Sequence, residues 1–171
     1  MNQQTASAAE ILWGQMVEAD TNFSIAFRAF FSEGVDRVPT VRAGLRSGGM
    51  GQAVALRVFP YLDISERMRL FSDLVFLASA AHGSIDAVRH QILLLPREWV
   101  LETIEQEAEP LLRQGTYDEY RRFLELYELL GARDLVRRLA LRAAASPDPD
   151  IREAGEDYPP KGEPAGSKAA T

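Results

Sequence analysis

Residues 116–131 read TYDEYRRFLELYELLG and carry the signals of one complete α-helix. Thr116 is a favoured N-cap residue, and Glu119 three positions later completes a capping box, in which each side chain accepts a hydrogen bond from a backbone N–H of the first turn. The apolar and aromatic side chains that follow recur at steps of three and four residues, which is the spacing of one helix face. Gly131 comes after the last of them, where a left-handed residue commonly ends a helix. These signals predict a helix over residues 117–130.

Helical spacing extends from this stretch over nearly the whole chain. We expect helices at about residues 7–34, 52–59, 63–82, 84–95, 96–112, 117–130, 133–145 and 150–157. No segment alternates apolar and polar residues over more than a few positions, as a half-buried strand would. The sequence therefore predicts an all-α fold of about eight helices. From residue 63 on, the expected connections are so short that neighbouring helices must run antiparallel, and antiparallel hairpins then stack as a solenoid or a bundle.

The chain is 171 residues long, so one domain is the default expectation. We expect a single helical domain over residues 1–158, with an irregular link at about residues 35–51. Pro39 and the glycine-rich run at 47–51 weaken the helical pattern in that link. Residues 159–171 contain no large apolar side chain that could repay the entropy of ordering, and we expect them to form a disordered tail.

One connection near the C-terminus has a recognisable pattern, because residues 146–157 read SPDPDIREAGED. An Asp-Pro-Asp turn is followed by the aliphatic Ile151, by Arg152 and, two positions later, by Ala154. This stretch resembles the inter-helix turn and the start of the second helix of a HEAT-type repeat. It occurs once, and Gly155 departs from the apolar run that the HEAT family shows next. The resemblance implies a HEAT-like stack that binds partner proteins as a scaffold; the alternative is a proline-interrupted connection without kinship.

The N-terminal residues lack the positive stretch and apolar core of a secretory signal. The longest apolar stretch, residues 70–81, is twelve residues long and includes Asp73. A membrane-spanning helix needs about 20 largely apolar residues. We therefore expect a cytoplasmic protein without membrane insertion.

Residue types that carry catalysis or bind metals are scarce. The chain has no cysteine, which removes disulfides, cysteine nucleophiles and cysteine-ligated metal sites. The two histidines, His82 and His90, fall in different expected helices and in no His-Glu-x-x-His spacing. No Gly-x-Ser-x-Gly motif is present, and the acidic face of Glu102, Glu105 and Glu109 carries no histidine. We expect no catalytic residue, no metal and no cofactor, and hence a protein that is not an enzyme.

Two arginines form a candidate anion-binding site. Arg42 and Arg46 are four residues apart and precede a glycine-rich turn that leads into a helix N-terminus, where phosphates and other anions are often bound. The other interpretation of the turn is a flexible link between helices.

Charge is unevenly spread between two neighbouring expected helices. Residues 101–130 hold eight acidic and three basic residues, whereas residues 131–145 hold one acidic and four basic residues. Of the basic ones, Arg133, Arg137 and Arg138 are candidates for binding an acidic partner. The alternative is weak pairing within the chain between the two helices. With an isoelectric point near 5.0, we expect no binding to nucleic acid.

Aromatic residues mark two further candidate surfaces. The segment from Phe23 to Phe31 contains four phenylalanines at helical steps, so it is either core or an uncovered docking or dimerisation surface on which Phe27 and Phe31 would make contact. Tyr117 could likewise rim a groove.

These observations favour a non-catalytic protein–protein interaction module, such as an adaptor, an assembly factor or a subunit of a larger complex. The partner would be another protein or a second copy of the chain. The expected partner-binding residues are Phe27, Phe31, Tyr117, Arg133, Arg137 and Arg138. The alternative is a helical bundle, either an enzyme or a binding protein, that binds a small apolar or anionic ligand. It would use Arg42, Arg46, His90 and tyrosines around an internal pocket.

Overall fold

A computed structural model of the chain describes residues 7–32 and 34–158, and all regular elements within these ranges are helical. The elements are α1 (Ala8–Ser32), α2 (Val38–Ser47), α3 (Gly49–Val58), the 3-10 turn η1 (Phe59–Tyr61), α4 (Ile64–Arg69), α5 (Phe71–Ala78), α6 (Ile85–Leu93), α7 (Arg97–Arg113), α8 (Tyr117–Leu129), α9 (Arg133–Ala144) and α10 (Pro149–Glu156). The predicted all-α class is confirmed, and the described residues form ten α-helices where about eight were expected.

The chain divides into two compact units, of which the first ends at Arg37 and the second begins at Val38. Helix α1 is the regular element of the first unit, and none of its residues is buried. The second unit contains the hydrophobic core. The sequence predicted one domain over residues 1–158, whereas the structure groups the described residues into two units. The predicted tail at 159–171 lies outside the described residues.

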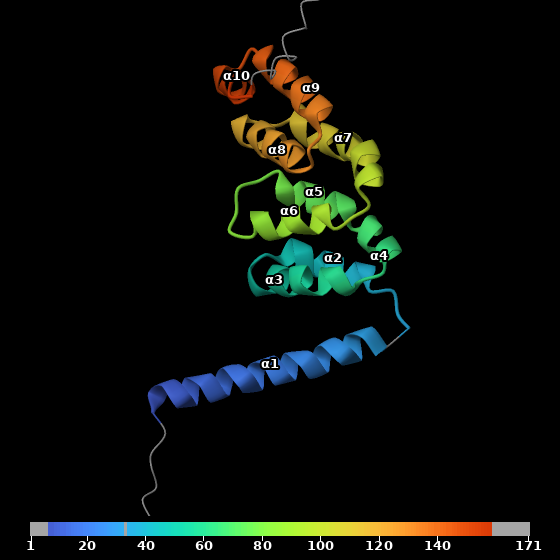
Figure 1. Cartoon of the computed structure of the whole chain (residues 1–171), viewed down its shortest axis with the longest axis vertical. Helices are drawn as coiled ribbons and strands as arrows, with labels where there is room; N and C mark the ends of the chain where they lie inside the picture. The colour runs from blue at the N-terminus through green and yellow to red at the C-terminus, as the bar shows by residue number, and fades with distance from the viewer. Residues whose placement is uncertain (1–6, 33, 159–171) are drawn as a thin grey trace, which may run out of the picture. The chain divides into compact units, whose positions relative to one another are not determined.

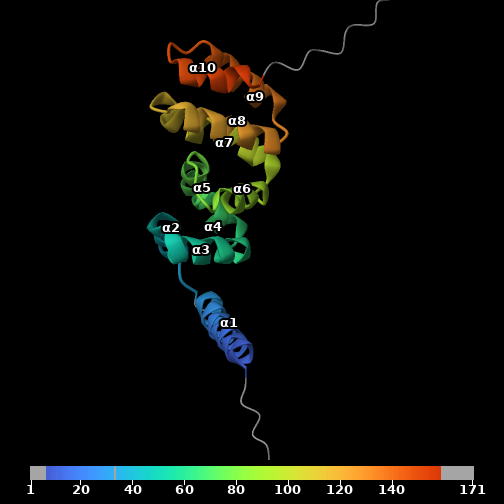
Figure 2. The ribbon, with the colours of Figure 1, turned by 90° about the vertical axis from the view of Figure 1, so that its left-hand side faces the viewer.

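The second unit is a stack of antiparallel helical hairpins (Figures 1 and 2). The hairpins are α2–α3, α5–α6, α7–α8 and α9–α10, and each contacts its neighbour in the stack. Side chains between the layers are fully buried, among them Phe59, Phe71, Leu74, Ile92, Ile104, Phe123 and Tyr127. Trp99 of α7 packs edge-on against Phe71 of α5, with ring centroids 5.0 Å apart.

Local sequence signals set several helix ends. The capping box at Thr116 and Glu119 is formed, and so is the one at Asp63 and Glu66. Gly131 follows α8 with a φ of 63°, which is left-handed backbone that favours glycine. These three predictions of helix ends are confirmed.

The predicted irregular link at about residues 35–51 is wrong, because most of it is helix. Val38, Val41 and Leu45 recur at helical steps and are buried, so tertiary packing stabilises α2 despite the proline in its first turn. Residues 35–37 are not helical, and from residue 38 on the helical conformation is interrupted at Gly48, whose φ of 69° separates α2 from α3. Helix α3 therefore starts at Gly49, three residues before the predicted start at residue 52.

The predicted helix over residues 63–82 is also wrong in its extent, because it is divided at Leu70. Leu70 has φ −101° and ψ 2°, and its N–H bonds to Arg67 three residues back, so the helix tightens and stops there. The carbonyl of Arg69 accepts a hydrogen bond from Arg42 instead. Helix α5 ends at Ala78, so Gly83 does not close it. His82 lies beyond this end and contacts the Leu77 carbonyl at 2.8 Å.

Candidate functional site

Both ends of helix α1 are capped by hydrogen bonds with side chains of the first unit. Ser7 and Glu10 form a reciprocal pair, in which each backbone N–H bonds the other side chain, at 2.7 and 3.3 Å. The hydrogen bond from the Ser7 backbone holds the pKa of Glu10 below its ordinary value. At the other end, the Arg37 guanidinium donates to the carbonyls of Phe30 and Phe31, at 3.1 and 3.0 Å. These contacts satisfy backbone groups that a helix end leaves open.

One side of α1 is apolar along most of its length. The residues on this side are Leu12, Trp13, Met16, Val17, Phe23, Phe27, Phe30 and Phe31. We call them the α1 apolar face. Trp13 and Met16 are 67% and 64% exposed, although an apolar side chain gains free energy when it leaves water. Asp20 lies within the same face by its position on the helix.

The phenylalanine end of this face is half-buried. The rings of Phe23 and Phe27 are 6.0 Å apart between centroids, and those of Phe27 and Phe31 are 4.7 Å apart. The Arg37 guanidinium carbon lies 5.1 Å from the centroid of the Phe31 ring. None of these rings belongs to the buried core. Phe27 and Phe31 therefore lie at the surface of α1, as a docking surface requires.

The arginines of α9 divide into two groups. Arg138 donates two hydrogen bonds to Glu105 of α7, at 3.1 and 2.7 Å, and Arg142 donates to Glu109 at 2.5 Å. The hydrogen bond from Arg142 lowers the pKa of Glu109. Pairing within the chain thus accounts for part of the uneven charge. Among the ion pairs of residues 7–32 and 34–158, none involves Arg133 or Arg137.

Tyr117 belongs to a network that joins α6, α8 and the C-terminal end of α10. Its hydroxyl accepts from Arg121, which also pairs with Asp157. Arg121 lies 3.3 Å from Glu125, which also binds Arg89 of α6 at 2.6 Å and Arg122 at 2.9 Å. This network consists of Arg89, Tyr117, Arg121, Arg122, Glu125 and Asp157.

The neighbours of Glu125 in this network determine the direction of its pKa shift. Burial alone would raise its pKa, but hydrogen bonds from Arg89 and Arg122 outweigh burial and the pKa is lowered. The i, i+4 spacing of Arg121 and Glu125 is visible in the sequence, whereas the pairing with Arg89 across 36 positions is not.

Arg42 and Arg46, the candidate anion site, are brought together on Asp73 of α5. Their guanidinium groups lie 2.9 and 2.7 Å from the two carboxylate oxygens. The Asp73 side chain is 2% exposed, and a buried carboxylate requires such partners. The anion that these arginines hold in the described residues is therefore one of the chain's own carboxylates. In the sequence, the sign of this buried carboxylate was that Asp73 is a charged residue inside the apolar stretch at residues 70–81.

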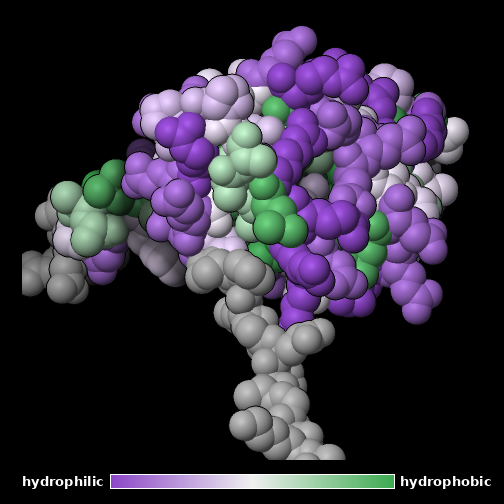
Figure 3. Space-filling view, turned by 90° about the horizontal axis from the view of Figure 1, so that it is seen from above, coloured by the Kyte–Doolittle hydropathy of each residue, from purple (hydrophilic) through white to green (hydrophobic). Residues whose placement is uncertain are grey.

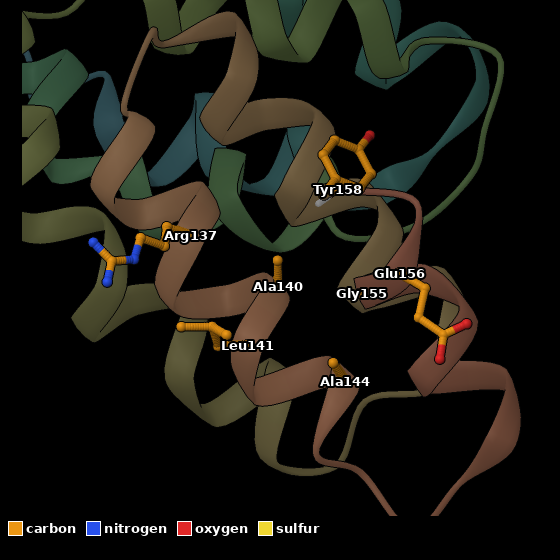
Figure 4. A pocket seen from close by; sticks show the side chains of 7 residues that line it. All are labelled: Arg137, Ala140, Leu141, Ala144, Gly155, Glu156 and Tyr158. Atoms are coloured by element: carbon orange, nitrogen blue, oxygen red, sulfur yellow. The ribbon is translucent and has the colours of Figure 1, made fainter. Parts of the chain in front are cut away.

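A shallow pocket of about 290 Å³ lies between α9 and α10 (Figure 4). It is lined by Arg137, Ala140, Leu141 and Ala144 of α9 and by Gly155, Glu156 and Tyr158. The two helices approach closely here, because a Cβ added at Gly155 would lie 2.6 Å from the Ala140 carbonyl oxygen. This end of the stack is mostly polar, interrupted by a patch of apolar side chains (Figure 3). His90 is exposed on α6 and does not line this pocket.

The described part of the chain has neither a metal-binding cluster nor a membrane-spanning helix. It contains no group of three or more His, Asp or Glu side chains arranged to hold a metal ion. It also contains no helix that is long and apolar enough to span a membrane.

No protein family, curated protein or solved structure gives a match to this chain. The HEAT-type resemblance at residues 146–157 stays a prediction. Its turn is stabilised locally, because Asp148 accepts hydrogen bonds from the N–H groups of Asp150 and Ile151. Arg152 donates to the carbonyl of Ser146 across the same turn, at 2.9 Å.

Proposed function

We propose that this protein is a non-catalytic interaction module that binds another protein through the α1 apolar face. The observation that carries this proposal is that none of the 25 residues of α1 is buried, although one side of the helix is apolar over most of its length. Exposed apolar patches rimmed by polar residues are typical of docking surfaces.

The spacing of the α1 apolar face suits insertion into a groove of a partner. Trp13, Met16, Phe23, Phe27 and Phe30 follow steps of three, seven, four and three residues, which is the helical spacing by which an amphipathic helix binds such a groove. Asp20 occupies the position between Met16 and Phe23. From the first to the last of them the face extends for about 26 Å along the helix. Trp and Phe side chains bury about 150–250 Å² each when they leave water completely, and each partner buries roughly 800 Å² in a stable complex. The exposed Trp13 and the half-buried phenylalanines can therefore supply part of that area.

The charge of α1 favours a protein over a membrane surface. Its charged residues are Glu10, Glu18, Asp20 and Arg28, so three are acidic and one is basic. Helices that lie on membranes usually carry lysine and arginine on the polar side, which attract anionic lipids. A scaffold role, as the HEAT-type resemblance implies, is part of this proposal, and so is a location in the cytoplasm.

The test compares two variants of α1 in the cells from which the sequence comes. Met16→Glu places a charge on the apolar face, whereas Ile25→Glu places one on the opposite side, where Ile25 is 59% exposed. We expect tagged wild type and Ile25→Glu to co-purify the same protein in stoichiometric amount, and Met16→Glu to lose it. Equal capture by both variants, or by neither, would refute a partner bound to this face. Circular dichroism of both variants checks that the substitutions leave the helix content unchanged.

A further inference from the structure

We propose that α1 of one molecule docks antiparallel on the outer side of α9 of a second molecule, so that copies of the chain associate head to tail. This inference rests on the proposed function, because it takes α1 as the docking element, and it identifies a second copy of the chain as a partner.

The outer side of α9 is exposed, whereas the corresponding face of α7 is buried in the stack. Glu105 of α7 and Arg138 of α9 are hydrogen-bonded to each other and are 33 positions apart. A residue of α9 therefore corresponds to the residue of α7 that lies 33 positions before it. The residues 33 positions before Arg133, Arg137 and Leu141 are Val100, Ile104 and Ala108, and all three are fully buried in α7. In α9 the corresponding three side chains are exposed, and Leu141 is 54% exposed. This face is buried within the stack in α7, and in α9 a helix from a second molecule would cover it.

The residue spacing of α1 matches that of α9 when the two helices run antiparallel. Placing Met16 against Leu141 brings Trp13 over Ala144, three residues away on each helix. The same alignment brings Asp20 to Arg137, four residues away on each helix in the other direction. The apolar contacts then fall on the pocket between α9 and α10, which Leu141 and Ala144 line. Asp20 then lies opposite Arg137 at the edge of these apolar contacts.

About one turn further, three residues along α1 and four along α9, Phe23 comes near Arg133, where a guanidinium can lie over an aromatic ring. The net charges agree with this alignment: α1 holds three acidic residues and one basic residue, whereas α9 holds four arginines and one aspartate. Arg138 and Arg142 are engaged by α7, which leaves Arg133 and Arg137 to face a partner. Opposite charges steer association and fix the alignment of an interface.

Pairing of α1 with α1 is less favourable on the same grounds. A parallel pair would place Asp20 opposite its own copy in the middle of an apolar seam, where two carboxylates repel each other. An antiparallel pair would place Asp20 opposite an apolar side chain in each molecule. Helix α9 offers Arg137 at that position instead.

Because the two contacting surfaces differ, the association is heterologous and need not close at two copies. We expect the mass of the full chain in sedimentation velocity to rise with concentration past the dimer. Met16→Glu removes the donor surface and Leu141→Glu removes the acceptor surface, so each variant alone stays monomeric. An equimolar mixture of the two forms a 1:1 complex, because each variant supplies the surface that the other lacks. Ile25→Glu and Leu129→Glu are the matched controls, since Leu129 is 54% exposed like Leu141.

Charge exchange tests the alignment. Asp20→Arg and Arg137→Asp should each weaken self-association about tenfold, and the two together in one chain should restore it to within about threefold of wild type. Glu18→Arg, on the opposite side of α1 from Met16, should leave the association unchanged or strengthen it only slightly.

Three outcomes would overturn this inference: a wild type that stays monomeric up to about 1 mM, association that Leu141→Glu does not change, or a mixture of Met16→Glu and Leu141→Glu that forms no complex. None of these outcomes bears on the proposed function, which fails if Met16→Glu and Ile25→Glu capture partner protein equally or if neither captures any. Circular dichroism of each variant separates loss of association from loss of fold.

Discussion

Arg138 and Glu105 form a two-point contact across 33 positions of the chain, with hydrogen bonds of 3.1 and 2.7 Å that join α9 to α7. Both side chains are at least half exposed. The pair therefore shows how the two helices are aligned in the stack, and it contributes little to the free energy of unfolding.

A double-mutant cycle of Arg138→Ala and Glu105→Ala should give a coupling free energy below about 1 kcal/mol by urea denaturation. In about 1 M salt the coupling should fall towards zero, because exposed charges are screened. A coupling above about 2 kcal/mol would contradict this assignment as an exposed pair.

Asp73 represents the opposite case, a buried carboxylate held by two arginines that reach it from the surface. Replacing both Arg42 and Arg46 by Ala leaves this charge buried without a partner, and we expect a loss of about 3–5 kcal/mol in the free energy of unfolding. Adding Asp73→Ala to that variant should recover most of the loss, since the buried charge is then gone. Further destabilisation on adding the third change would contradict the explanation.

Gly155 marks a close approach of α10 to α9. A Cβ at this position meets the Ala140 carbonyl oxygen and the Ala144 nitrogen at 2.6 Å, and both atoms are backbone, which cannot move aside cheaply. Gly155→Ala should lower the free energy of unfolding by about 1–3 kcal/mol. Gly83→Ala is the matched control, because no atom lies within 4 Å of its added Cβ. That variant should be neutral or slightly more stable in thermal unfolding.

Glu125 should make stability depend on pH on the acid side. Its pKa is lowered in the folded protein, so its contribution is fully present above the pKa of the unfolded chain. The contribution is then lost as the pH falls through the lower pKa of the folded state. In urea titrations from pH 6 to pH 3, Glu125→Gln should show a flatter decline of the denaturation midpoint than wild type. An unchanged slope would show that Arg89 and Arg122 do not stabilise the charged form.

Local signals predicted the helices and many of their ends, because capping boxes and terminal glycines act within a few residues. The same signals failed at Leu70, where a break leaves the apolar spacing of the two flanking helices intact. They failed again in α2, where burial of Val38 and Leu45 outweighs the local effects of Pro39 and the nearby glycines.

The candidate site was predictable only in part. The aromatic spacing of α1 identified Phe27 and Phe31, but whether that face is core depends on what packs against it, which spacing does not encode. Arg133, Arg137 and Arg138 looked equivalent in the sequence. They differ because Glu105 lies beside Arg138 in the stack, and a separation of 33 residues gives no local signal.

The two tryptophans lie in different units, with Trp13 exposed on α1 and Trp99 against Phe71 in the stack. Each unit therefore carries its own intrinsic fluorophore. In a Trp99→Phe variant, all tryptophan emission comes from the α1 apolar face, so a blue shift on mixing with a binding partner would report its transfer out of water. In a Trp13→Phe variant, the remaining emission follows only the unfolding of the helical stack.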